Sequence, residues 1–388
     1  MTEDMLSRRR LLAIAATTVT AGCGGRNNSQ NDQSGRFATN ETTAGAGTST
    51  TTTTRQTETA NSVEIDIETK TQAEPEPRPD QQPRTEQSTE TTETATPTGA
   101  ALLRKAKDEL NQSLTTYIDI EDVDSIVELD ASNTEFDENA VRKHLKKATR
   151  HLDDAELKGG VSEQNVAQLR TAREAIAKLV DCQAAIVTTY EKFDDAYDAL
   201  FDEKYGTVTR NLSQMDLYRS KTKDRRKAFK RSVSPADFEP VDGFSADDYD
   251  VKLDQFATEI DSFDQVKSPI TKLNGGVRKF SDAVEWYVDK SYETAYQKFL
   301  ESQNGFEQPS TTFMRITVAD AIRKQVEILQ STANGLAKGT NHMLKSCRSG
   351  ENDNEENRRE RLYDAMRKYG RSGHVSQLPS YQYLSDNT

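Results

Sequence analysis

The stretch that decides the fold is ITVADAIRKQVEILQSTANGLAKGTNHMLKSC, residues 316–347. Ten positions in it, most of them apolar, recur at intervals of three and four residues. They are Ile316, Ala319, Ile322, Val326, Leu329, Ala333, Leu336, Thr340, Met343 and Cys347. Because an α-helix turns once in about 3.6 residues, this spacing predicts one narrow apolar stripe along a long helix. Such stripes are typical of coiled coils and long-helix bundles.

Two further stretches carry the same spacing. The first consists of Leu253, Phe256, Ile260, Phe263, Val266, Ile270, Leu273, Val277, Phe280, Val284 and Tyr287. The second consists of Ile176, Leu179, Cys182, Ile186, Tyr190, Phe193, Tyr197 and Leu200. The alternation of apolar and polar residues that marks a strand is nearly absent after residue 99. We therefore predict an all-α fold, either a long-helix bundle or an antiparallel coiled-coil-like array.

Glycine and proline place the expected helix ends. Ser234-Pro235 and Ser268-Pro269 each look like an N-cap followed by proline in the first turn, and Gly159-Gly160 closes a helix. Asn274-Gly275-Gly276 is expected to kink a helix, and Gly206 either ends a helix or bends a longer one. These signals predict helices near 100–118, 137–157, 162–205, 208–231, 236–263, 268–305, 311–347 and 355–369. The helical domain is expected over 99–348, with a short helix and a flexible tail over 349–388.

The residues before this domain have a different composition. The 388-residue chain is 34% hydrophobic, with a mean hydropathy of -0.84. That deficit is concentrated before residue 99, and residues 26–98 are rich in Thr, Pro and Glu. A segment with so few apolar side chains cannot repay its loss of chain entropy by burial, so we expect a disordered stalk. The net charge of -13 argues against a general nucleic-acid binder, which is normally basic.

The N-terminus has the organisation of an export signal. Ser7-Arg8-Arg9-Arg10 is followed by a short, mildly apolar stretch over residues 11–19. That stretch is too short for a transmembrane helix and suits a cleaved signal. Small residues, Ala21 and Gly22, then precede Cys23.

These residues resemble two known signals. Arg8 and Arg9 are similar to the pair in a twin-arginine export signal, although Leu11 stands where Phe is usual. The segment ending at Cys23 resembles a lipobox, with Thr20 in place of the usual Leu. Together they look like the N-terminus of a lipoprotein of halophilic archaea. The resemblance implies that residues 1–22 are a removed signal, that residues 23–25 carry the lipid on Cys23, and that the chain is anchored to the outer face of the cell membrane.

One segment of the helical domain is strongly basic. Eight of the thirteen residues from 219 to 231 are Lys or Arg, namely Arg219, Lys221, Lys223, Arg225, Arg226, Lys227, Lys230 and Arg231. One interpretation is a docking patch for an anionic partner, either a protein or an anionic surface. The other is a solvated helix end that complements its own dipole or pairs with Asp194, Asp195 and Asp202.

The sequence offers little for catalysis or metal binding. His144 and His151 lie among Lys146, Lys147 and Arg150, which would repel a metal ion, so we predict no metal site and no cofactor. Cys182 and Cys347 fall on apolar stripes, which leaves open either two buried thiols or one disulfide bond.

Two functions remain open at this point. The first is a non-enzymatic surface protein with a helical interaction or scaffold domain. The second is a helical ligand-sensing or solute-binding lipoprotein that works with a membrane partner. Its pocket would be lined by Tyr190, Tyr197, Trp286 and Tyr287.

Overall fold

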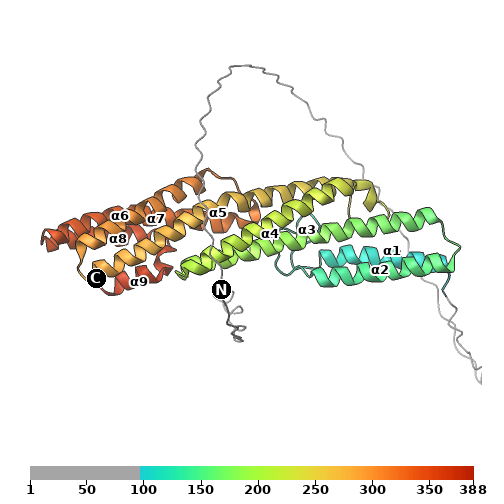
Figure 1. Ribbon diagram of the computed structural model, residues 1–388, viewed down its shortest axis with the longest axis horizontal. Coiled ribbons are helices and arrows are strands. Elements are labelled where there is room, and N and C mark those ends of the chain that lie inside the picture. Colours follow the sequence, from blue (N-terminus) through green and yellow to red (C-terminus); the bar gives the residue numbers. More distant parts are fainter. Residues whose placement is uncertain (1–96) are drawn as a thin grey trace, which may run out of the picture. The chain divides into compact units, whose positions relative to one another are not determined.

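The computed structural model describes residues 97–388, and over this range the all-α prediction is confirmed (Figure 1). The described residues form nine α-helices, two short 3-10 helices and no strand. In chain order they are α1 (Gly99–Tyr117), α2 (Glu138–Lys158), α3 (Glu163–Phe201), α4 (Tyr205–Ser232), η1 (Pro235–Phe238), α5 (Ala246–Val288), α6 (Tyr292–Arg315), α7 (Asp320–Glu351), α8 (Glu355–Gly370), η2 (Val375–Gln377) and α9 (Pro379–Asp386).

Neighbours in the sequence pack side by side. The turns after α3, α5 and α7 are short, and short connections favour antiparallel neighbours. Accordingly α1 packs on α2, α3 on α4, α5 on α6, α6 on α7, and α7 on α8 (Figure 1). Helix α5 has 43 residues and is therefore about 65 Å long. It contacts α3 and α4 as well as α6 and α9, so one helix connects the two ends of the bundle.

The predicted stripes form the core. On α7, every stripe position from Ile322 to Cys347 is buried, and on α5 the same holds from Leu253 to Tyr287. Aromatic contacts join α5 to its neighbours at both ends. The ring centroids of Phe263 and Phe193 are 5.9 Å apart, and those of Phe280 and Tyr369 are 5.5 Å apart.

Contrary to the prediction, neither serine–proline pair marks the start of a long helix. Pro269 lies inside α5, so the predicted helix start at Ser268 is wrong. Proline removes one backbone donor and crowds the preceding turn, but the stripe continues on both sides and its burial outweighs that local cost. Pro235 begins only the four-residue η1, and α5 starts later, where Ser245 and Asp248 form a capping box.

The chain reverses at residues that carry side chains. Glu203, Lys290 and Asp353 have φ values of 55°, 60° and 53°, and each lies in the turn between two helices. Gly206, in contrast, is in the first turn of α4, so α3 and α4 are separate helices. The predicted helix over 268–305 is divided at the turn that contains Lys290, because α5 ends at Val288 and α6 begins at Tyr292.

Replacing Lys290 by glycine should stabilise the bundle by about 0.5–1 kcal/mol, because a side chain at positive φ is strained and glycine is not. Lys290 is exposed, and its side chain has no ion-pair partner within residues 97–388. Urea unfolding would measure the change. The matched control is Lys272→Gly on the exposed face of α5, which should cost about 1 kcal/mol because its backbone is helical. Equal destabilisation by both changes would contradict the strain at Lys290.

The C-terminal residues are part of the bundle. A flexible tail was expected after α8, but the chain forms η2 and α9, and both Leu378 and Leu384 are fully buried. The backbone N–H of Ser380 donates to Glu203 Oε1 at 3.0 Å, which ties α9 to the turn between α3 and α4.

The predicted signal, Cys23 and the predicted stalk up to residue 96 lie outside the described residues. Among the helices that are described, none combines the length and apolar character needed to span a membrane.

Candidate interaction surface

The basic segment lies on the C-terminal half of α4, and helical geometry divides it in two. Arg219 and Arg226 share a face with the buried Thr222 and Phe229, at spacings of three and four residues. Arg219 Nη2 lies 2.7 Å from Asp216 Oδ1 and 3.0 Å from Asp264 Oδ1, and Arg226 Nε donates to the Leu253 carbonyl at 2.8 Å. Both arginines therefore fasten α4 to α5.

Arg225 points to the other neighbour of α4. Its Nη1 donates to the Asp181 carbonyl on α3 at 2.7 Å. On the same side, Lys221 Nζ lies 4.5 Å from the ring centroid of Tyr218. Three of the eight cations are thus structural, which agrees in part with the interpretation that the segment pairs internally.

Two of the acidic residues that were expected to pair with the basic segment, Asp195 and Asp202, pair with other lysines. Asp195 pairs with Lys192 at 2.6 Å, and Asp202 pairs with Lys204 at 2.9 Å. The arginines are instead held by Asp216, Asp264 and backbone carbonyls.

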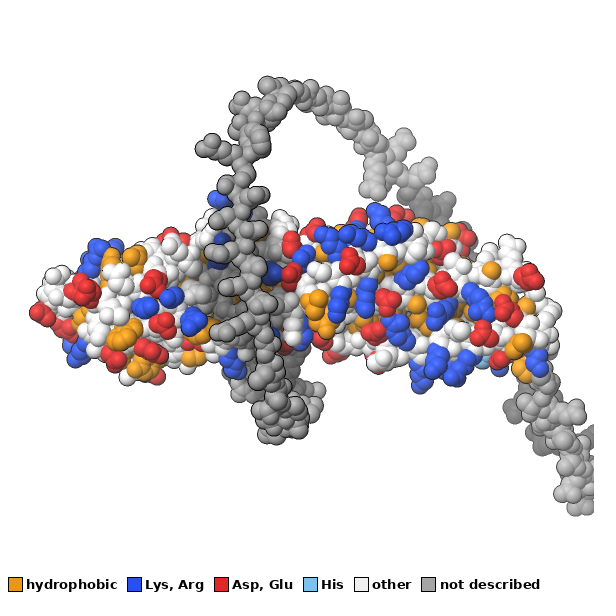
Figure 2. Space-filling model, in the orientation of Figure 1, with side chains coloured by type: hydrophobic (Ala, Val, Ile, Leu, Met, Phe, Trp, Pro, Cys, Tyr) orange, Lys and Arg blue, Asp and Glu red, His pale blue; other side chains and the backbone are white. Residues whose placement is uncertain are grey.

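Four cations form an exposed surface that we call the basic stripe: Lys223, Lys227, Lys230 and Arg231. Their spacing of four, three and one residues confines them to a sector of about 100° on α4. All four are exposed, and none has an ion-pair partner among the described residues. Figure 2 shows Lys and Arg side chains gathered over α4 and the α1–α2 pair, with acidic side chains between them. Lys230 and Arg231 also lie in the last turn of α4, where a helix dipole favours positive charge.

The predicted aromatic pocket is not formed. The Tyr190 hydroxyl accepts a hydrogen bond from Gln325 Nε2 at 2.8 Å, whereas the Tyr287 hydroxyl lies 2.7 Å from Ser346 Oγ. Gln325 and Ser346 are about 30 Å apart along α7. Trp286 is 44% exposed. The four aromatic residues therefore do not line one cavity, and that prediction is wrong.

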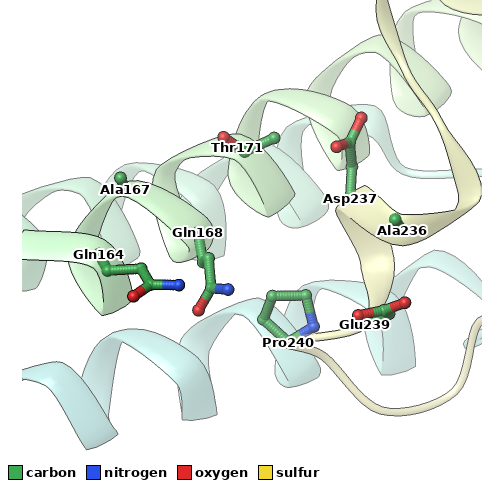
Figure 3. Close-up of a pocket in the computed structure, with 8 residues that line it drawn as sticks. All are labelled: Gln164, Ala167, Gln168, Thr171, Ala236, Asp237, Glu239 and Pro240. Atoms are coloured by element: carbon green, nitrogen blue, oxygen red, sulfur yellow. The ribbon is translucent and has the colours of Figure 1, made fainter.

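A shallow pocket of about 470 Å³ lies between α3 and the segment around η1 (Figure 3). Gln164, Gln168 and Thr171 of α3 face Asp237 and Pro240 across it. Asp237 already accepts a hydrogen bond from the Ser234 backbone N–H at 2.7 Å. This pocket presents amide, hydroxyl and proline groups with no buried, unpartnered polar atom, so it offers no particular chemistry.

Cys182 and Cys347 are free thiols, and both are buried. Of the two interpretations left open, the structure thus supports the thiols and not the disulfide. Burial raises the pKa of Cys182 and of Cys347 to about 12, so neither forms a reactive thiolate near neutral pH.

His144 contributes to the packing of α2 on α1. His144 Nδ1 lies 2.7 Å from Glu109 Oε2 on α1, and Lys147 contacts the same carboxylate. Within residues 97–388 no three His, Cys, Asp or Glu side chains are grouped so that they could hold a metal ion.

Sequence reasoning missed a buried pair of charged residues on α5. Lys252 Nζ donates to the Leu129 carbonyl, and Glu259 Oε1 accepts a hydrogen bond from the Ala131 backbone N–H at 2.9 Å. Burial lowers the pKa of Lys252 to about 8 and raises the pKa of Glu259 to about 7. Both side chains hold the loop over residues 118–137, between α1 and α2, against α5.

The sequence did contain a signal for this pair. Lys252 and Glu259 alternate with Phe256 and Phe263 at spacings of four, three and four residues, which places them on the core face of a helix.

Comparisons with protein-family models, with curated proteins and with solved structures find no match to this chain.

Proposed function

We propose that this chain is a non-enzymatic interaction protein, anchored by lipid at Cys23 to the outer face of the cell membrane, whose helical bundle docks an acidic partner protein. The observation that carries this proposal is the basic stripe. Three arginines of the same segment are bonded within the fold, while Lys223, Lys227, Lys230 and Arg231 are exposed on one face of α4 without partners among the described residues.

An acidic protein fits this surface better than a lipid bilayer does. Asp224 is exposed beside Lys223 on α4, and such mixed charge suits a partner with its own pattern of charges. The stalk that the composition of residues 26–98 predicts would span about 45–50 Å on average. That length favours reach away from the anchoring membrane.

Replacing the four residues of the basic stripe by glutamine should weaken partner binding by about 30-fold. Each exposed charge contact contributes about 0.5 kcal/mol, so four contribute about 2 kcal/mol. The partner would first be recovered from intact cells by cross-linking to the parent chain. Its affinity for purified parent and variant would then be measured over a range of salt concentrations.

The matched control removes four exposed lysines from α5 and α7: Lys272, Lys324, Lys338 and Lys345. It makes the same change in net charge and should leave affinity within about threefold of the parent, since only long-range attraction is lost. Arg225→Gln with Arg226→Gln should instead lower the melting temperature, because both side chains bond to backbone carbonyls. Equal binding by the parent and the stripe variant would contradict the proposal.

The anchor has its own test. Cys23→Ser should remove the chain from the membrane fraction, because this thiol is the proposed attachment point for lipid. Arg8→Lys with Arg9→Lys should block export, since a twin-arginine signal is read through its arginine pair. A serine variant that fractionates with membranes as the parent does would contradict lipid anchoring at Cys23.

A further inference from the structure

A second pocket lies beneath the loop over residues 118–137. Its volume is about 480 Å³, and its walls come from that loop, from α5 and from the start of α7. The loop contributes Glu128 and Asp130, and α5 contributes Gln255 and Glu259. None of these residues belongs to the basic stripe, so the inference stands apart from the proposed function.

Two lining side chains have unfilled acceptor positions. Glu259 is 2% exposed, and its Oε1 is used by Ala131, but its Oε2 has no hydrogen-bond partner among the described residues. Gln255 Oε1 is also buried without a partner, while its Nε2 donates to the Leu129 carbonyl at 3.3 Å. The two residues are four apart and share one face of α5. Because a buried acceptor without a donor is costly, this pair calls for a group with N–H or O–H donors.

The charged residues around the pocket favour a bound group with positive charge. The lining carboxylates are Glu128, Asp130, Glu259 and Asp320. The lining cation Arg323 is paired with Asp320, and the buried Lys252 beside Glu259 offsets one further charge, so the pocket keeps a negative balance. Val127, Val318 and Ala321 add apolar surface. An anion would meet like charge and no free donor, whereas a cation with an alkyl part would meet both acceptors and apolar contacts.

We propose that this pocket binds a small organic cation with N–H donors, a primary amine or a guanidine on a short alkyl chain. The cation would donate to Glu259 Oε2 and Gln255 Oε1. A metal ion fits less well, because no three carboxylate, histidine or thiol groups converge in the part of the chain that the structure describes.

The charge of Glu259 should control binding. Burial raises the pKa of this carboxyl to about 7, so its anionic form, which attracts the cation, is lost as the pH falls below that value. Glu128 and Asp130 on the loop, Asp320 and Arg323 on α7, and Lys252 on α5 are the other charged groups around it. Affinity for the cation should therefore fall between pH 8 and pH 6.

Calorimetric titration of the purified full chain with agmatine, which carries both an ammonium and a guanidinium group, tests the proposal. Tetramethylammonium at equal ionic strength is the matched control ligand, because it has the charge but no N–H donor. We expect heat and a raised melting temperature with agmatine only. Glu259→Gln should weaken agmatine binding at least about tenfold, since it removes a charged acceptor.

Gln255→Met is the second variant, at a half-buried position that tolerates change better. It removes the other acceptor and should weaken binding about tenfold. Glu327→Gln, on an exposed part of α7, is the control and should bind as the parent does. Three results would overturn the proposal: no agmatine binding at millimolar concentration, equal binding of tetramethylammonium, or unchanged binding in both Glu259→Gln and Gln255→Met. Tight binding of Ca²⁺ in place of agmatine would also overturn it.

Discussion

Gly305→Ala should destabilise the helical bundle by about 3 kcal/mol, at the upper end of the range for overpacked cores. Helices α5 and α6 cross at Gly276 and Gly305 with their backbones in contact. A Cβ atom on Gly305 would lie 2.5 Å from Gly276 Cα and 2.9 Å from Gly276 N. Backbone atoms cannot rotate away as a flexible side chain can, so the two helices would have to separate. The melting temperature should fall by about 6–10 °C.

Gly275→Ala is the matched control for this change. Gly275 directly precedes Gly276 on α5, its backbone is helical, and a Cβ there meets nothing within 4 Å. Alanine should therefore stabilise α5 by about 0.5–1 kcal/mol through helix propensity. Opposite shifts in melting temperature for Gly305→Ala and Gly275→Ala would support the crossing. A neutral Gly305→Ala would contradict the close approach of α5 and α6.

The second large effect is a loss of stability as the pH rises from 5 to 7.5. The pKa of Glu259 is raised by burial from 4.5 to about 7, so the folded chain holds a proton that the unfolded chain has released. Raising the pH through this window ionises a buried carboxyl and should lower the free energy of unfolding by about 2 kcal/mol. Lys252, whose pKa in the folded chain is about 8, stays mostly charged between pH 5 and pH 7.5. It therefore changes the free energy of unfolding little over this range.

Glu259→Gln isolates this contribution. His342 acts with the opposite sign, because burial lowers its pKa and its folded form resists protonation as the pH falls. Since His342 is present in both chains, its contribution cancels, and the difference between parent and variant reports Glu259 together with its interaction with Lys252. Urea unfolding measures the free energy of unfolding of both chains at pH 5 and at pH 7.5. The value for the variant minus the value for the parent should rise by about 2 kcal/mol between the two pH values. A constant difference between the two pH values would contradict the buried, protonated carboxyl.

Periodicity predicted the helices and their buried faces well. All positions of the stripes from Leu253 to Tyr287 and from Ile322 to Cys347 are buried, as predicted. The spacing of apolar residues indicates directly which face of a helix meets the core.

Helix ends were predicted less well, since glycine and proline have other roles in this bundle. Pro269 and Pro309 lie inside helices, and Gly276 serves a close helix crossing. The turns instead use Glu203 and Lys290 at positive φ. Local propensities could not indicate this, because the packing of long stripes overrides the cost at single positions.

The candidate surface was only half predictable. The density of positive charge from residue 219 to 231 was evident, but which cations face solvent depends on where α3 and α5 pack. Phe229 at a core spacing with Thr222 indicates the buried side of α4 in retrospect. The partners of Arg225 and Arg226 are backbone carbonyls of distant helices, which no local pattern specifies.

Site-specific photo-cross-linking in living cells tests the central claim, that the basic stripe docks an acidic protein. A photoreactive side chain would replace Lys227 in the stripe, and Lys338 on α7 in a matched variant. The account predicts a discrete cross-linked product from position 227 that maps to an Asp- and Glu-rich surface of one partner. It predicts loss of that product when Lys223, Lys230 and Arg231 are changed to glutamine, and no such product from position 338. The same product from both positions, or none from position 227, would contradict the docking role of the stripe.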